Sequence, residues 1–349
     1  MQILSAKRVF IRTDANPTIA SGHVMRCLAI ADALHASGIQ VNFVLSDANP
    51  VDIICERGYK TLVLQTNWRL VEEGIEELQA RCMELSEAPV VLIDTYSVTA
   101  SYVERLAQCA KVCYLGSKDD NLGNLSLLVD YSTDVDKIRY ETFYSERKTK
   151  LLLGPLYAPI RTQFASAYKK RSGAIRRVLV TTGNTDPWGF IPEFLYAALE
   201  SQVFDGITFA IVVGSMFNDK TKIEDIAVNN PRIELHCEVA DMVRLMSTAD
   251  IAVSANGTTV YEMAAIGLPV VTFAMVQEQI KSAESLGACG ATAYAGAFEG
   301  TVKDIVRRVL ILLKELVSYP ETTLGLADRA HALVDGLGAD RIAREIIAL

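Results

Sequence analysis

The sequence predicts an α/β protein with two domains, each built on a parallel β-sheet. Short runs rich in β-branched residues alternate with helical patterns along the whole chain, which is typical of parallel strands joined by crossover helices. With 349 residues the chain is too long for one ordinary hydrophobic core and fits two domains of about 150–170 residues. Half of the residues are hydrophobic and 22% are charged, so both cores can be filled.

The first half of the chain, residues 1–158, is expected to form one domain. Apolar residues recur at helical spacing between Val24 and Leu34, and Gly38 provides a stop after them. This stretch is the clearest helix of the half. The strands that we expect here are Arg8–Arg12, Val41–Leu45, Thr61–Leu64, Val90–Ile93, Val112–Leu115 and Leu127–Val129.

The second half, residues 159–349, is expected to form the other domain. The segment from 157 to 177 carries Pro159 and then several basic residues, and we interpret it as the connection between the domains. The last helix, from Asp340 to Leu349, is expected to pack back across the first domain. The strands that we expect here are Arg177–Thr182, Ile207–Val213, Ile233–Cys237, Ile251–Ser254 and Val270–Met275.

The composition argues against several classes of function. A net charge of −8 disfavours a general nucleic-acid binder and a polybasic membrane dock. No stretch approaches the roughly 18 apolar residues of a membrane span, and Lys7 and Arg8 interrupt the apolar run near the N-terminus. The seven cysteines show no CxxC pair and indicate reduced thiols. We therefore expect a soluble cytoplasmic protein with no nucleic-acid partner, no membrane insertion and no obligatory protein partner.

Ligands of open parallel sheets bind beyond the carboxyl ends of the strands, so the loops there are the places to search. In the first such loop, Ser21 is a candidate N-cap and Gly22 would let a ligand approach the backbone. His23 falls in the first turn of the helix, where the positive end of the dipole favours a neutral imidazole that can act as a base. A surface histidine near a helix cap is an equally open interpretation of this pattern.

The second loop follows a buried strand and opens a helix with Asn256, Gly257, Thr258 and Thr259. Free N–H groups and hydroxyls at such a helix start form an anion site that suits a diphosphate. Glu262 lies one turn further along and could accept hydrogen bonds from two ribose hydroxyls. The alternative is a glycine-rich turn with an acidic residue that favours the helix dipole.

A third loop, Thr181–Pro187, also follows a strand and contains Gly183. Pro187 would suit the first position of the next helix. Taken alone, this loop indicates no more than a well-made turn.

Together these loops resemble those of a known family. The matching residues are Arg12, Asp14, Gly22, His23, Arg26 and Cys27, then Asp94 and Tyr96, Asp119 and Asp120, Gly154, Tyr157, Ala158, Ile160 and Arg161, and finally Thr259, Glu262 and Gln279. Their order and spacing resemble the UDP-sugar hydrolases of pseudaminic acid biosynthesis (the PseG type) and their SpsG-like spore-coat-polysaccharide relatives. Those proteins belong to the GT-B superfamily, which also contains the MurG transferase. The likeness covers nearly the whole chain.

The resemblance implies two Rossmann-like domains whose parallel sheets face a central cleft, where the nucleotide-sugar would bind. It also implies a hydrolase that needs no metal and no cofactor. Its substrate would be a UDP-linked 2,4-diacetamido-2,4,6-trideoxy sugar, the altropyranose in the PseG type, which is split into free sugar and UDP for a nonulosonate or a surface polysaccharide.

The resemblance also implies a set of site residues. His23 would be the base that activates water, and Asp14 near it would be the second catalytic residue. The diphosphate would rest on residues 256–259, and Tyr96 would lie on the sugar side. The expected substrate-binding residues are Arg12, Gly22, Arg26, Tyr96, Gly183, Asn256, Gly257, Thr258, Thr259, Glu262, Glu278 and Gln279. No set of His, Asp or Glu residues has metal-ligand spacing, so no metal site is expected.

Two alternatives stay open. The family often has a glycine at position 184 and an asparagine at position 278, where this chain has Asn184 and Glu278. A GT-B glycosyltransferase could use the same groups, because an acceptor hydroxyl would simply replace water. A nucleotide-sugar-binding protein without catalysis is the other alternative.

Overall fold

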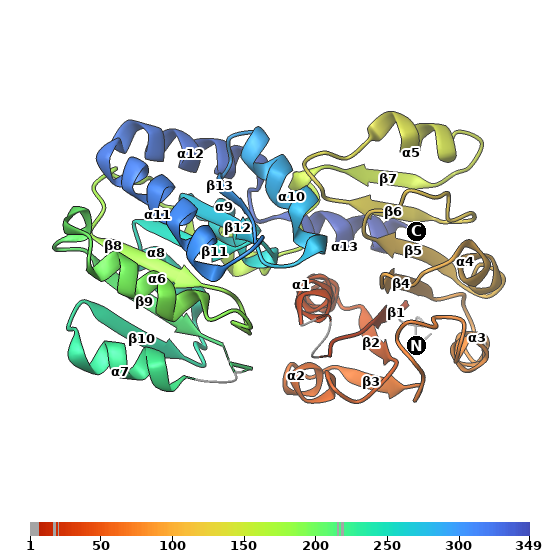
Figure 1. Cartoon of the computed structure of the whole chain (residues 1–349). Coiled ribbons are helices and arrows are strands. Elements are labelled where there is room, and N and C mark those ends of the chain that lie inside the picture. Colours follow the sequence, from red (N-terminus) through yellow and green to blue (C-terminus); the bar gives the residue numbers. More distant parts are fainter. Residues whose placement is uncertain (1–6, 17–18, 20, 215, 218–219) are drawn as a thin grey trace. The chain divides into compact units, whose positions relative to one another are not determined.

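The computed structural model describes residues 7–16, 19, 21–214, 216–217 and 220–349. The chain divides into two compact units (Figure 1). Unit 1 comprises Met1–Thr162 together with Leu337–Leu349, and unit 2 comprises Gln163–Gly336. Within the described ranges, no helix is long and apolar enough to cross a membrane.

Unit 1 is built on a parallel sheet of seven strands in the order β3-β2-β1-β4-β5-β6-β7. The strands are β1 Arg8–Thr13, β2 Gln40–Leu45, β3 Lys60–Val63, β4 Val90–Asp94, β5 Lys111–Leu115, β6 Leu127–Asp130 and β7 Lys150–Leu153. Six of them lie where the sequence predicts them. The seventh was missed because the run KLLL contains no β-branched or aromatic residue.

Helices cover both faces of this sheet, because successive side chains of a strand point to opposite faces. Val9 and Ile11 of β1 belong to the cluster that contains α1 and α13, whereas Phe10 belongs to the cluster of α3 and α4. The helices of unit 1 are α1 Gly22–Ala36, α2 Val51–Glu56, α3 Ile75–Met83, α4 Ala100–Leu106, α5 Lys137–Phe143 and α13 Gly338–Ala348, with the short 3₁₀ helix η1 Pro155–Tyr157.

The last helix, α13, returns to unit 1, so the units differ from the expected division at residues 158 and 159. Ile342 and Ile346 are fully buried in the same cluster as Leu28 of α1, which explains why this stretch leaves unit 2. The chain packs closely where α13 begins: a Cβ at Gly338 would lie 2.2 Å from the carbonyl oxygen of Ala158. The expected packing of the last helix on the first domain is thereby observed.

Unit 2 has a parallel sheet of six strands in the order β10-β9-β8-β11-β12-β13. The strands are β8 Arg177–Thr181, β9 Thr208–Val213, β10 Ile233–Cys237, β11 Ile251–Ala255, β12 Val270–Ala274 and β13 Ala293–Ala297. The helices are α6 Phe190–Leu199, α7 Thr221–Asn229, α8 Met242–Thr248, α9 Thr258–Ala265, α10 Gln277–Ala288, α11 Val302–Ser318 and α12 Pro320–Leu333, with η2 Thr162–Ala167 and η3 Gln202–Phe204. β13 was not predicted because its sequence, AYAGA, is rich in alanine and glycine.

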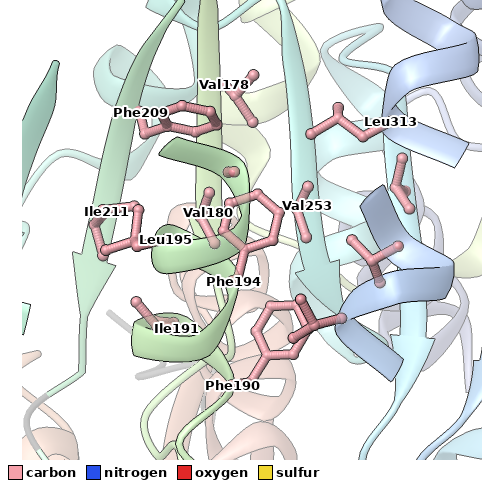
Figure 2. Packing of buried hydrophobic residues seen from close by; sticks show 14 of the residues in the cluster. Val178, Val180, Phe190, Ile191, Phe194, Leu195, Phe209, Ile211, Val253 and Leu313 are labelled. Atoms are coloured by element: carbon pink, nitrogen blue, oxygen red, sulfur yellow. The ribbon is translucent and has the colours of Figure 1, made fainter. Parts of the chain in front are cut away.

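The core of unit 2 joins α6 and α11 to the central strands. Figure 2 shows Phe194 of α6 beside Val180 of β8 and Val253 of β11. Phe190 stacks on Phe273 of β12 with ring centroids 4.2 Å apart. These contacts fix the strands whose carboxyl ends carry the second and third loops.

The strand register places the candidate loops beside one another within each unit. Thr13 pairs with Asp94, so the loop after β1 and the loop after β4 leave the sheet as neighbours. In unit 2, Thr181 pairs with Ser254, which brings the loops after β8 and β11 together.

Candidate functional site

His23 lies at the start of α1 and is buried, with 4% of its surface exposed. Its Nδ1 atom is 2.7 Å from Oδ1 of Asp94, the last residue of β4. The placement of His23 in the first helical turn is as predicted. Ser21 occupies the N-cap position but its side chain does not cap the helix, and Gly22 is the first residue of α1.

Arg26, one turn further along α1, binds the same carboxylate with two donors. Its Nε donates to Asp94 Oδ2 at 2.7 Å and its Nη2 donates to Oδ1 at 2.5 Å. Its Nη1 donates to the hydroxyl of Tyr131 at 2.8 Å. Cys27 also donates to Oδ2, at 3.3 Å. Arg26 therefore serves as a partner of Asp94 in the structure, and its predicted contact with substrate stays a prediction.

The two charges in this cluster stabilise each other. Burial alone would raise the pKa of the Asp94 carboxyl, but Arg26 and His23 hold it well below its usual range. Burial lowers the pKa of Arg26, and the carboxylate beside it more than reverses that effect and raises it well above the usual value. Asp94 is thus an ionised hydrogen-bond acceptor at neutral pH.

The second ring nitrogen of His23, Nε2, has a different environment from Nδ1. Its Nε2 atom is buried and has no hydrogen-bond partner among the residues that the structure describes. Tyr96 lies edge-on to the ring, with centroids 4.5 Å apart and planes at 71°, and is itself 54% exposed. Buried polar atoms are normally satisfied, so Nε2 is a candidate for contact with a ligand.

Arg12 and Asp14 form a separate buried pair at the end of β1. Arg12 Nη1 donates to Asp14 Oδ2 at 2.6 Å, and Arg12 Nη2 donates to Ser46 Oγ at 2.5 Å. The other carboxylate oxygen of Asp14 accepts the backbone N–H of Ser46 at 2.7 Å. The carboxylate that the structure places at the imidazole is therefore that of Asp94. Sequence reasoning matched Asp94 to a family motif but gave it no role, and the catalytic role of Asp14 stays a prediction.

In unit 2, Asn256 follows β11 and is 2% exposed. Its Oδ1 atom has no hydrogen-bond partner within the described part of the chain, and its Nδ2 donates to the carbonyl oxygen of Gln279 at 3.4 Å. Gly257 is the N-cap residue of α9, and a Cβ there would meet nothing within 4 Å. Thr258 and Thr259 open the helix, and no described side chain caps it.

A second buried polar atom lies at the end of the neighbouring strand. Thr182 follows β8, the neighbour of β11, and its Oγ1 also lacks a partner among the described residues. Gly183 comes next with φ +86°, a conformation that favours glycine. The ends of β8 and β11 thus present two buried polar atoms at one edge of the sheet.

Three further predicted residues lie near the same edge. Glu262 is buried within α9, and Glu278 is exposed in the first turn of α10. The side chain of Gln279 folds back, because its Oε1 accepts the N–H of Met275 at 2.8 Å. Gln279 thus bonds to Asn256 through its backbone carbonyl oxygen. Its side chain bonds to the backbone of Met275, directly after β12.

The loop after β8 differs from the prediction in its final part. The helix α6 begins at Phe190 and not at Pro187, because the carboxylate of Asp186 accepts the N–H groups of Phe190 and Ile191 at 2.8 and 2.9 Å. The pKa of Asp186 is raised by burial. An acidic residue ahead of a helix is the signal that could have placed this cap.

Two other features of the described residues are separate from these clusters. A groove of about 350 Å³ lies between α6 and α11 and is lined in part by Phe204, Val306 and Leu310, but by none of the predicted site residues. In the described ranges no three His, Cys, Asp or Glu side chains come together closely enough to hold a metal ion.

No family model matches the chain. Two curated proteins are similar in sequence: an uncharacterized protein of Methanocaldococcus jannaschii, 21% identical over 276 residues, and the spore coat polysaccharide biosynthesis protein SpsG of Bacillus subtilis, 27% identical over 202 residues. These alignments cover 76% and 57% of this chain. The chain spans little more than half of the length of each relative, 55% and 58%.

Solved structures resemble the chain over nearly its full length. MurG of Acinetobacter baumannii has a TM-score of 0.66 at 14% identity, covering 98% of this chain and all of that one. A UDP-GlcNAc 2-epimerase of Neisseria meningitidis has a TM-score of 0.63 at 14% identity, with the same coverage. The chain thus consists of two Rossmann-like α/β domains with parallel sheets, which is the GT-B fold.

Proposed function

We propose that this protein hydrolyses a nucleotide-activated sugar and releases the free sugar and a nucleoside diphosphate. The observation that supports this proposal best is the arrangement of His23. One ring nitrogen is held by an ionised carboxylate, and the other is buried without a partner among the described residues. A neutral imidazole in this arrangement can take a proton from water.

The reaction needs one base and one site for an anion. Nε2 of His23 takes a proton from water, and the oxygen of that water forms a bond to the anomeric carbon. The bond from that carbon to the diphosphate oxygen breaks, and its electron pair leaves with the diphosphate. The leaving group is a stable anion, so no strong acid has to protonate it. A positioned base of this kind contributes about 10²–10⁴-fold to the rate.

Unit 2 offers the groups for the nucleotide. The start of α9 carries the positive end of a helix dipole and N–H groups without partners inside the helix, and both stabilise a diphosphate. Asn256 adds a buried polar atom beside it. Glu262, one turn further along, would accept hydrogen bonds from ribose hydroxyls. A local site of this kind is necessary because the chain as a whole carries a charge of −8.

The finer identity of the substrate rests on the resemblance. The motif residues are similar to those of UDP-sugar hydrolases, and SpsG is named for spore coat polysaccharide biosynthesis. We therefore propose UDP as the nucleotide and a 2,4-diacetamido-2,4,6-trideoxyhexose as the sugar. The product would enter the synthesis of a surface polysaccharide or of a nonulosonate.

Nucleotide binding can be measured by calorimetry with UDP alone. We expect Asn256→Ala and Glu262→Gln each to weaken UDP binding by about tenfold or more, since a charge-assisted or buried hydrogen bond contributes about 1.5–3 kcal/mol. His23→Gln should bind UDP like the wild type. Asn229→Ala is the matched control in the same unit, because that side chain is exposed on α7 and donates to the carbonyl oxygen of Asp225 in its own helix. Unchanged UDP affinity in both site variants would refute the proposed nucleotide site.

Turnover without an acceptor separates hydrolysis from the alternatives. We expect UDP release from the UDP-linked sugar in buffer alone. Release only after an acceptor alcohol is added would identify a glycosyltransferase that uses the same base. Binding of UDP without release under either condition would identify a binding protein, and either result would overturn hydrolysis.

A further inference from the structure

Two charged side chains, Asp94 and Arg26, hold the inner side of the His23 ring. We propose that they are positioning residues that lock the neutral imidazole in one tautomer, with the proton on Nδ1 and the lone pair on Nε2. This inference rests on the proposed function for its purpose, because it explains how the base is prepared. It concerns the location of one proton, however, and can be tested without turnover.

Hydrogen-bond acceptors face Nδ1 of His23. Asp94 Oδ1 lies 2.7 Å from Nδ1, and the backbone carbonyl oxygen of Asp94 lies 3.4 Å from it. An ionised carboxylate and a carbonyl can accept hydrogen bonds but cannot donate them. Both contacts are satisfied when Nδ1 carries the proton. In a neutral ring the lone pair then has to be on Nε2.

Among the described residues, Arg26 makes a contact that competes with these acceptors. Its Nη2 lies 3.2 Å from Nδ1, and a guanidinium can only donate, so this contact alone would favour a lone pair on Nδ1. The same Nη2 is only 2.5 Å from the carboxylate oxygen, which is its shorter and charge-assisted bond. The shortest contact of Nδ1 is likewise with that oxygen. The carboxylate therefore decides which nitrogen carries the proton.

Arg26 also balances the charge beside the ring. A lone buried carboxylate would favour a second proton on the imidazole, and the resulting imidazolium would have no lone pair to accept a proton from water. Arg26 neutralises that carboxylate through both of its oxygens. The other ionisable groups of the cluster, Cys27 and Tyr131, have pKa values raised by burial and stay uncharged, although Arg26 opposes this effect at both. The pair thus presents an acceptor to Nδ1 and leaves the charge beside the ring balanced.

The ring nitrogens can be observed directly by NMR in the full chain labelled with ¹⁵N-histidine. The protein has four histidines, and the signals that disappear in His23→Gln belong to His23. We expect the wild-type ring at neutral pH to show a protonated Nδ1 and an unprotonated Nε2. A proton on Nε2 alone, or on both nitrogens, would overturn the proposal. We call Asp94 and Arg26 the clamp. The wild-type spectrum needs no substitution in the clamp, so the test remains valid even if a clamp variant fails to fold.

Two variants test the two members of the clamp separately. In Asp94→Asn the amide can present either its oxygen or its NH₂ group to Nδ1, so we expect a mixture of tautomers in place of one. In Arg26→Gln the carboxylate is left with the imidazole alone, and we expect a doubly protonated ring at neutral pH. Arg26→Lys retains the positive charge and should restore the neutral ring. A merely structural role of Asp94 and Arg26 would not produce these two different signatures. Unchanged His23 signals in both variants would refute the proposal that the two residues fix the tautomer.

The control is a surface ion pair of the same unit. Arg139 donates to Asp119 at 2.7 Å, and the Asp119 side chain is largely exposed. Arg139→Gln and Asp119→Asn should leave the His23 signals unchanged. If the wild-type tautomer is as expected but no UDP-sugar is hydrolysed, the clamp stands and the proposed function fails. If hydrolysis is found with a proton on Nε2, the proposed tautomer and the base role of Nε2 both fail, while the hydrolytic activity itself stands.

Discussion

The charges around His23 are coupled to the stability of unit 1. The side chain of Asp94 is fully buried and that of Arg26 is 14% exposed. Removing such ions from water costs several kcal/mol each. The bidentate contact between Arg26 and Asp94 offsets this cost, together with the bond from Arg26 to Tyr131 and the bond from Cys27 to Asp94. Loss of one partner leaves the other buried and uncompensated. The residues that position the imidazole therefore also hold the start of α1 against the end of β4.

This coupling predicts how the effect of Asp94→Asn depends on pH. At neutral pH the substitution should lower the free energy of unfolding by about 3–5 kcal/mol, because Arg26 loses its counter-charge. The pKa of Asp94 is depressed in the folded chain, so its contribution is complete above the ordinary value of 3.8 and is lost as the pH falls through the folded value. Urea unfolding of both proteins between pH 7 and pH 3 measures the difference. We expect the difference in unfolding free energy between the two proteins to shrink as the pH falls from about 4 to 3; a difference that widens over this range would contradict the assignment.

Single residues could be predicted here only where the signal was local. His23 follows from its position at a helix start, and Asn256 follows from a run of small polar residues after a buried strand. Asp94 carries no such signal, because its partner His23 lies 71 residues away in sequence and only the register of β1 with β4 brings them together. The family resemblance places Arg12 and Asp14 in the site with His23, yet they bond to Ser46 on the other side of β1.

At the scale of elements, the loops after β8 and β9 are held by a close approach of their backbones. A Cβ at Gly214 would lie 2.5 Å from the Cα and the carbonyl oxygen of Asn184. Met216 also donates its N–H to that oxygen at 3.2 Å. Glycine at position 214 therefore sets the path of the loop that leads from Thr182 to α6. A methyl group there can be accommodated only if one backbone moves.

Gly214→Ala should consequently destabilise unit 2 by about 1–3 kcal/mol, the usual cost of overpacking. Gly257→Ala is the matched control: its φ is −170°, which any residue adopts, and its added Cβ would meet open space. We expect Gly257→Ala to unfold at nearly the wild-type temperature but to bind UDP more weakly, because its methyl group would stand where a diphosphate approaches. Thermal unfolding and UDP calorimetry on both variants check this. Equal losses of stability in the two would show that the close approach has no effect.

Strands and helices were predictable from the sequence to the extent that their composition was typical. The six strands expected in the first half are present, and the clearest of them, Val90–Asp94, is rich in β-branched residues and buried on both faces. The leucines of β7 and the alanines of β13 gave no such signal. The preference of proline for the first position of a helix places the start of α6 at Pro187, which is too early. The carboxylate of Asp186 accepts the N–H groups of Phe190 and Ile191, so the helix begins at Phe190.

At the scale of the whole molecule, unit 1 is discontinuous and is completed by the last 13 residues of the chain, Leu337–Leu349. The expected division into 1–158 and 159–349 places this segment in the wrong unit. The expectation that this last helix packs on the first domain is met, but the division at residue 158 does not count the helix as part of that domain. In the structure Ile342 and Ile346 are buried beside Leu28 of α1, the helix that also carries His23. Unit 1 therefore needs both ends of the described chain for the core behind its histidine.

We propose that His23 directs water to the anomeric carbon of a nucleotide-sugar. The most direct test is to incubate the protein with a UDP-linked 2,4-diacetamido-2,4,6-trideoxyhexose in H₂¹⁸O without an acceptor, and to analyse the products by mass spectrometry. We expect equal amounts of free sugar and UDP, with no ¹⁸O in the UDP because the carbon–oxygen bond is the one that breaks. His23→Gln should slow the release by about 10²–10⁴-fold. Absence of UDP release, ¹⁸O in the UDP, or wild-type turnover by the folded His23→Gln protein would contradict the account.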